Sequence, residues 1–110
     1  MKAAQLLQEG ENALVLFTGG TDLDIEPDGT GLTGRWKVDP DRVPDRIILY
    51  VRPEGSNTAD IFTAINTGVA PSDIEGRSWI FLSNITNVGS TDFDWVEFAQ
   101  GGQNPVHYIS

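Results

Sequence analysis

The chain has 110 residues, a length that suits one domain with its own hydrophobic core. Its 16 acidic residues outnumber its 7 basic ones and give a net charge of -9, which repels nucleic acid and anionic lipid and favours cations or basic proteins. The chain has no cysteine for disulfides or zinc, no apolar run of signal-peptide type, and no segment with the ~20 apolar residues of a membrane span. We therefore expect a cytoplasmic protein, bacterial or delivered by a phage, that contacts neither nucleic acid nor membrane.

The predicted elements are mostly strands. Within residues 1–10, Lys2 to Glu9 form the expected short helix, because its apolar residues share one face and Gly10 can end it. The first predicted strand is 13–18 and is followed by two glycines. Further β-rich segments are separated by turn residues, and we expect strands at 33–38, 46–52, 58–67, 77–85, 93–99 and 106–109. Segments 46–52 and 77–85 are continuously apolar, so we expect both to be central and covered on both faces by the opposite sheet, the N-terminal helix or another subunit. This pattern predicts a mainly β fold: a single domain over 1–110, built as an antiparallel β-sandwich or small barrel of about seven strands.

The connection at 18–34 is the most unusual segment, an acidic, glycine-rich loop that reads TGGTDLDIEPDGTGLTG. It holds five glycines, and a carboxylate stands at every second position from Asp22 to Asp28. Such a loop could cradle phosphate, bind calcium or display negative charge.

Its first part resembles a known phosphate loop. The run from Leu14 to Asp22 is similar to the strand-to-loop SGGxDS element of PP-loop ATP pyrophosphatases, in which glycine amides and hydroxyls hold pyrophosphate. That resemblance implies a helix directly after the loop, with its N-terminal amides facing the phosphates. Here Pro27 and three glycines follow, and the further carboxylates would repel phosphate. We therefore expect a glycine-rich strand exit rather than a nucleotide-activating site.

Calcium is the second interpretation of this loop. Asp24, Glu26 and Asp28 precede Gly29, and a hard cation takes several oxygens at alternate positions around a sharp turn. An EF-hand loop would end on a glutamate, where this chain has Arg35. The alternatives are a looser calcium site and an ordinary solvated acidic loop.

A second candidate site lies near the C-terminus. Asp92 and Asp94 stand beside Trp95, and carboxylates next to an aromatic ring can bind a sugar. The string DFDWVEF is similar to the closing strand of jelly-roll carbohydrate-binding modules, and the resemblance implies a sugar-binding strand. The plainer interpretation is that Phe93 and Trp95 fill the core.

The basic residues form a third candidate site. Five of the seven lie between positions 35 and 52. With Trp36 at the surface, Arg35 and Arg46 could hold a small anionic ligand such as a nucleotide, although the same side chains could simply balance nearby aspartates. Catalytic groups are scarce, because the one histidine, His107, has no evident partner. We therefore expect no enzyme and no required cofactor.

These observations favour a small acidic binding or inhibitory protein. It would place an acidic face on a basic partner, or hold a small anionic ligand where copies of the chain meet as a homo-oligomer. The alternative is a carbohydrate- or calcium-dependent recognition module.

Overall fold

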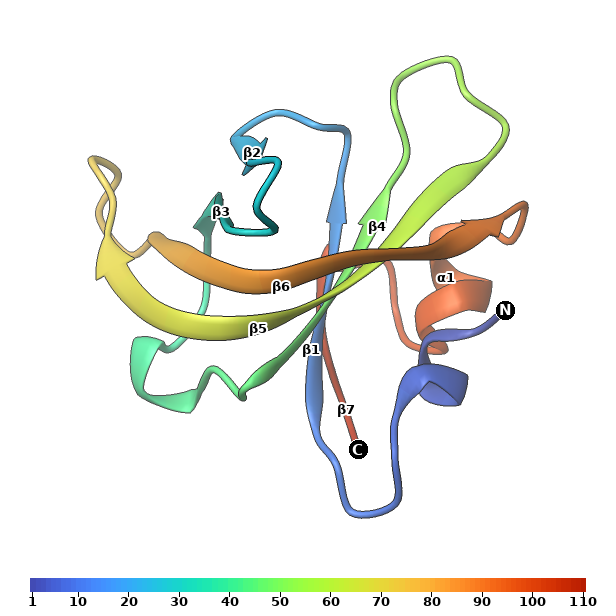
Figure 1. Cartoon of the computed structure of the whole chain (residues 1–110), viewed down its shortest axis with the longest axis horizontal. Coiled ribbons are helices and arrows are strands. Elements are labelled where there is room, and N and C mark those ends of the chain that lie inside the picture. The colour runs from blue at the N-terminus through green and yellow to red at the C-terminus, as the bar shows by residue number, and fades with distance from the viewer.

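Seven strands form one strongly curved sheet in the computed structural model, which describes all 110 residues. The strands are β1 (Ala13–Thr18), β2 (Leu23–Ile25), β3 (Gly31–Trp36), β4 (Arg46–Val51), β5 (Ala59–Pro71), β6 (Ser78–Thr91) and β7 (Val106–Ile109). Their order across the sheet is β2-β3-β6-β5-β4-β1-β7, so β2 and β7 are the two edges and the sheet is not a closed barrel (Figure 1). The prediction of a mainly β chain with about seven strands is confirmed.

The expectation of purely antiparallel pairing is wrong for one pair. β1 and β4 run parallel, in register from Ala13 with Arg46 to Thr18 with Val51, and every other pair is antiparallel. A parallel pair needs a long crossover, and residues 19–45 supply it through β2, β3 and the 3₁₀ turn Pro40–Arg42. Residue patterns identify strands but carry little information about the direction in which each strand runs. The sequence therefore did not predict the parallel pair that makes this sheet mixed.

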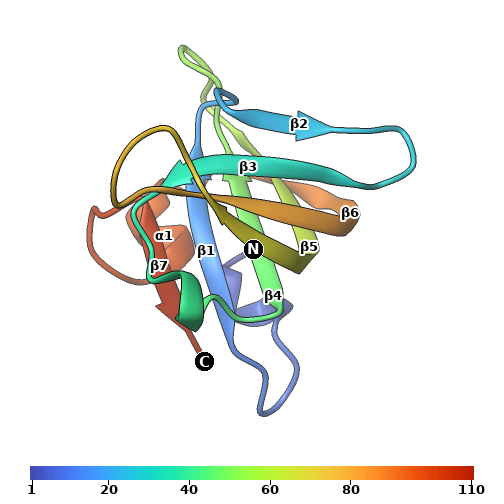
Figure 2. The same ribbon diagram turned by 90° about the vertical axis from the view of Figure 1, so that its left-hand side faces the viewer.

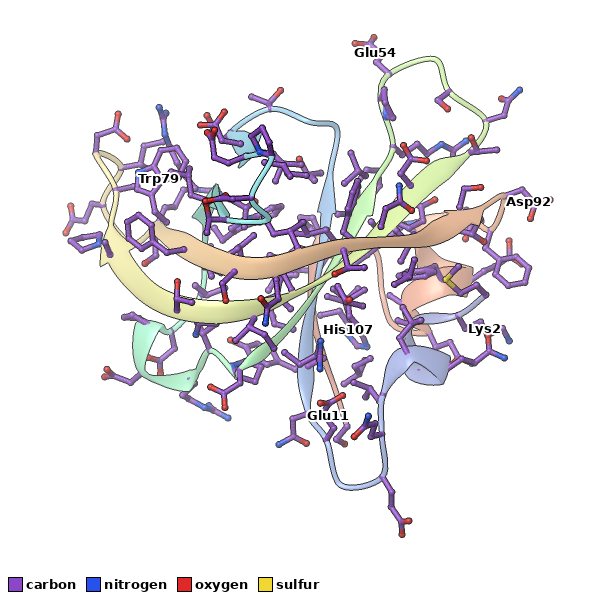
Figure 3. All side chains as sticks on the ribbon, in the orientation of Figure 1. Lys2, Glu11, Glu54, Trp79, Asp92 and His107 are labelled. Atoms are coloured by element: carbon purple, nitrogen blue, oxygen red, sulfur yellow. The ribbon has the colours of Figure 1, made fainter.

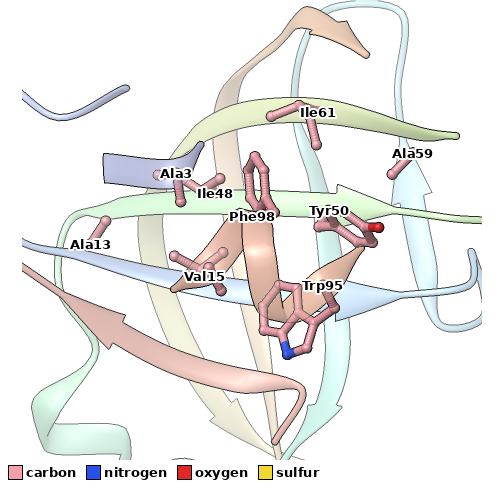
Figure 4. Packing of buried hydrophobic residues seen from close by; sticks show 10 residues of the cluster. Ala3, Ala13, Val15, Ile48, Tyr50, Ala59, Ile61, Trp95 and Phe98 are labelled. Atoms are coloured by element: carbon pink, nitrogen blue, oxygen red, sulfur yellow. The ribbon is translucent and has the colours of Figure 1, made fainter. Parts of the chain in front are cut away.

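The central strands β1 and β4 are buried on both faces. Side chains alternate along a strand, so the two faces feed two separate clusters of apolar residues. One face packs against the N-terminal 3₁₀ helix (Ala3–Leu6) and helix α1 (Trp95–Ala99), as Figure 4 shows for Val15, Ile48 and Tyr50. The other face packs against residues of β3 and β6. The prediction that segment 46–52 is central and covered on both faces is confirmed.

Strands β5 and β6 make a long bent hairpin that curls the sheet over that second cluster. Their pairing shifts register at three places, and such bulges bend and twist a strand pair. The bend carries β3 across β1 and β4, so that Trp36, Ile80 and Leu82 join the same cluster (Figure 2). Only one face of β6 is covered within the chain, because Phe81 is 40% exposed, so neither the opposite sheet nor the N-terminal helix covers the second face of segment 77–85.

Segment 93–99 was expected to be a strand, and that prediction is wrong. After an extended start it turns into α1, whose N-terminus is capped by Asp94: its carboxylate accepts the backbone N–H of Glu97 at 2.8 Å. Trp95 and Phe98 are three positions apart, which places both on the buried side of a helix. The expected helix at 2–9 is shorter, a single 3₁₀ stretch from Ala3 to Leu6. None of the helices has the length and apolar character needed to cross a bilayer.

The two tyrosines of the chain provide a test of the helical side of the core. Tyr50 is fully buried and its hydroxyl donates to the carbonyl of Phe93 at 2.7 Å, which ties β4 to the start of α1. Tyr50→Phe leaves that carbonyl without its donor, so we expect the free energy of unfolding to fall by about 1–2 kcal/mol in urea titrations. Tyr108→Phe is the matched control: Tyr108 is 47% exposed, and its change should stay within about 0.5 kcal/mol. Equal losses in the two variants would contradict this role of the Tyr50 hydroxyl.

Candidate functional site

The acidic segment forms an ordered hairpin over much of its length. Leu23 pairs with Thr33 and Ile25 pairs with Gly31, so β2 and β3 run antiparallel at the edge of the sheet. The backbone N–H of Glu26 donates to the carbonyl of Thr30 at 2.8 Å and closes the connecting turn. We call β2, this turn and β3 the acidic hairpin; Figure 2 shows its turn reaching out at one side of the molecule. The sequence pattern did not predict β2, which has only three residues.

The turn of the acidic hairpin is held by its own side chains and by β6. The carboxylate of Asp28 accepts both the hydroxyl of Thr30 at 2.6 Å and its backbone N–H at 3.0 Å. The hydrogen bond from the Thr30 hydroxyl is the main cause that holds the pKa of Asp28 below its ordinary value, and the bond from the Thr30 backbone N–H adds to it. Gly29 adopts φ 85°, which favours glycine, and its carbonyl accepts the N–H of Ile85 at 2.9 Å. The carboxylate of Asp28 and the backbone of the turn therefore have a defined position.

The proposed calcium ligands are not gathered around a common point. Asp24 lies in β2, Glu26 begins the turn and Asp28 is engaged with Thr30. No three His, Cys, Asp or Glu side chains in the structure are placed to hold a metal ion together. The acidic hairpin thus presents these three charges to solvent separately.

Most of the negative charge of the protein is unpaired. Of the 16 carboxylates, Glu11, Asp22 and Asp73 are the three that lie within 4.0 Å of a basic group. Asp24, Glu26 and Asp28 have no such neighbour, and all three are exposed. Ile25, between them, is 41% exposed and adds an apolar contact surface.

Arg35 holds three segments of the protein together. Its Nε lies 3.2 Å from Asp73 in the β5–β6 turn and 3.9 Å from Asp22 before β2, and its guanidinium stands 5.7 Å above the ring of Trp79. Arg77 donates to the carbonyl of Arg35 at 3.2 Å. Figure 3 shows Trp79 beside the β5–β6 turn. Arg35 is therefore already neutralised, and the sequence pattern missed Trp79 as its partner.

The other two members of the expected anion site lie elsewhere. Trp36 is 8% exposed and donates to the hydroxyl of Thr33 at 3.0 Å inside the core, so it offers no aromatic plane at the surface. Arg46 begins β4, and its Nε lies 3.5 Å from the carboxylate of Glu11. Strands β6 and β5 lie between β4 and β3, which carries Arg35 and Trp36. The structure does not bring Arg35, Trp36 and Arg46 together.

The expected sugar platform is not at the surface either. Trp95 is 5% exposed, and its ring N–H donates to the carbonyl of Asn104 at 2.9 Å. Asp94 caps α1, while Asp92 is exposed at the end of β6. The Asp–x–x–Glu spacing from Asp94 to Glu97 is a helix-start signal that could have revealed this. The interpretation of Trp95 as a core residue is confirmed.

The glycines after β1 form a strand exit. The hydroxyl of Thr18 accepts the N–H of Gly20 at 3.0 Å, and the chain continues into β2 rather than into a helix. In three comparisons with known proteins, no family model, no curated protein and no solved structure matches the chain.

The turn of the acidic hairpin can be tested through Thr30→Val, which removes the hydroxyl that donates to Asp28. We expect the pKa of Asp28 to rise toward its ordinary value, measured by NMR titration of its side-chain carboxyl carbon. Because the folded-state pKa is lowered, the stability that this hydrogen bond adds is present at neutral pH and is lost as the pH falls through the pKa of Asp28. Thr67→Val, an exposed threonine on β5, should leave the pKa of Asp28 unchanged. An unchanged pKa in Thr30→Val would contradict the assignment.

The contact between Gly34 and Trp79 is the second test. A Cβ added at Gly34 would overlap the indole ring of Trp79, which must then move. We expect Gly34→Ala to cost about 1–3 kcal/mol in urea unfolding. Gly102→Ala, where an added Cβ meets nothing within 4 Å, should have little effect. In a Trp79→Ala background the cost of Gly34→Ala should shrink, and an unchanged cost would show that the ring is not its cause.

Proposed function

We propose that the protein is a small acidic, non-enzymatic binding protein that docks its acidic hairpin onto a basic protein surface. The observation that carries this proposal is the row of exposed, unpaired carboxylates Asp24, Glu26 and Asp28 on an ordered edge of the sheet. Complementary charge across an interface speeds association and selects the partner. A partner rich in lysine and arginine is the chemistry that matches this row.

The order of the acidic hairpin supports a protein partner. Its turn is fixed through Asp28, Thr30 and the hydrogen bond from Ile85, so little conformational freedom remains to be lost on binding. The exposed side chain of Ile25 can pack against an apolar part of the partner. The non-enzymatic part of the proposal rests on composition: no cysteine and one histidine, His107, whose ring lies against Gly101.

The test compares two variants with the same net charge. Asp24→Asn/Glu26→Gln/Asp28→Asn removes three charges from the acidic hairpin. Asp60→Asn/Glu54→Gln/Asp92→Asn removes three exposed, unpaired charges elsewhere; Figure 3 shows Glu54 and Asp92 away from β2. Binding of a fluorescent arginine-rich peptide is measured by anisotropy at low and at physiological salt.

We expect the hairpin variant to bind about tenfold more weakly than the control variant, since three exposed charge pairs contribute about 0.2–1 kcal/mol each. The difference should narrow as salt screens the charges. Equal weakening in both variants would show that only the overall charge attracts the peptide, and the proposed docking surface would be wrong.

A further inference from the structure

The hollows of the protein surface lie next to one another around the 3₁₀ turn Pro40–Arg42, and we call this group of hollows the trough. Four open hollows, of about 420, 280, 530 and 230 Å³, follow one another there. Each hollow shares lining residues with the next one. The first hollow (420 Å³) and the second (280 Å³) share Pro44, and the second and the third (530 Å³) share Arg42 and Tyr108. The third and the fourth (230 Å³) share Val38. The trough lies beyond the C-terminal end of β3, whereas the turn of the acidic hairpin lies before its N-terminal end.

The trough gathers basic side chains on an otherwise acidic protein, together with the carboxylates of Glu11, Asp39 and Asp45. Four of the seven basic side chains line it: Lys37, Arg42, Arg46 and Arg77. Arg46 is opposed by Glu11, and Arg77 donates to a backbone carbonyl. Lys37 and Arg42 are exposed and form no ion pair, so the third hollow, of about 530 Å³, has two cations free to bind an anion.

An aromatic ring stands beside these two cations. Tyr108, in the edge strand β7, is 47% exposed and lines the same hollow. The one carboxylate there, Asp39, already accepts the backbone N–H of Asp41 at 3.0 Å. Arginine and lysine bind phosphate oxygens, and a tyrosine face stacks on a planar ring. The volume falls within the range of small-molecule sites in proteins.

We propose that this hollow binds a small phosphate ester that carries an aromatic ring, of the chemical class of a mononucleotide. Arg42 and Lys37 hold the phosphate, and Tyr108 packs on the ring. The first hollow, at Arg46, is the poorer place for an anion, because Glu11 and Asp45 line it as well. The site is separate from the acidic hairpin, so a result for or against ligand binding here does not decide whether the hairpin docks onto a basic partner.

The experiment is an NMR titration of the isotope-labelled protein with AMP, inorganic phosphate and adenosine, each at millimolar concentrations. We expect AMP to give saturable shifts of the amide signals of Lys37, Arg42 and Tyr108. Phosphate and adenosine should each bind at least about tenfold more weakly, since each keeps only half of the contacts. Phosphate binding as tight as that of AMP would overturn the role of Tyr108, and no saturable shift with AMP would overturn the site.

Variants assign the contacts. Arg42→Gln and Lys37→Gln should each weaken AMP binding about tenfold, because each removes charged hydrogen bonds to the phosphate. Tyr108→Leu should weaken AMP binding and leave phosphate binding unchanged. Lys2→Gln changes the net charge equally outside the trough and should bind AMP like the parent protein. Unperturbed spectra of the free variants verify folding, and equal weakening in Lys2→Gln and Lys37→Gln would overturn the assignment.

Discussion

The burial of the parallel pair β1 and β4 on both faces is the constraint on which the rest of the structure depends. Alternate side chains of these strands point to opposite sides, and all of them from Ala13 to Leu16 and from Ile47 to Tyr50 are fully buried. A sheet with two apolar faces needs two covers. A chain of 110 residues with little helix has to provide one of those covers by bending its own sheet.

The two covers are built differently. On one side, two short helical segments from opposite ends of the chain meet over Val15, Ile48 and Tyr50, and Tyr50, Phe17, Trp95 and Phe98 form a group of aromatic contacts. On the other side the bulged β5–β6 hairpin curls, which brings β3 with it. The Arg35 contacts then join the loop before β2 to the β5–β6 turn. Packing of the core therefore determines where the acidic hairpin projects.

Strand β3 separates unpaired charges of opposite sign. β3 carries the acidic hairpin turn before its first residue and Lys37 just after its last. The carboxylates of the hairpin and the cations of the trough therefore lie at the two ends of one strand, too far apart to neutralise each other through short contacts. The hairpin end keeps unpaired carboxylates and the trough end keeps the unpaired cations Lys37 and Arg42, and this is the physical basis for proposing two distinct binding surfaces on so small a chain.

Local pattern was enough to establish the acidic character, the mainly β class, the position of most strands and the central place of segment 46–52, because these follow from composition and from the spacing of apolar residues. It failed where a distant contact decides. The direction of β4 relative to β1 depends on the crossover between them. The helix at 95–99 depends on the cap at Asp94 and on a core in which Trp95 can pack. The side of the sheet that Trp36 and Trp79 occupy depends on the curvature of the sheet. The candidate sites changed for the same reason. Trp36 packs with residues of β6 in the core, while Arg35 lies over Trp79 and beside Asp73, and the folded sheet creates both sets of contacts. Arg42 and Tyr108, 66 positions apart, line the same hollow only because the sheet brings the end of β7 to the turn after β3.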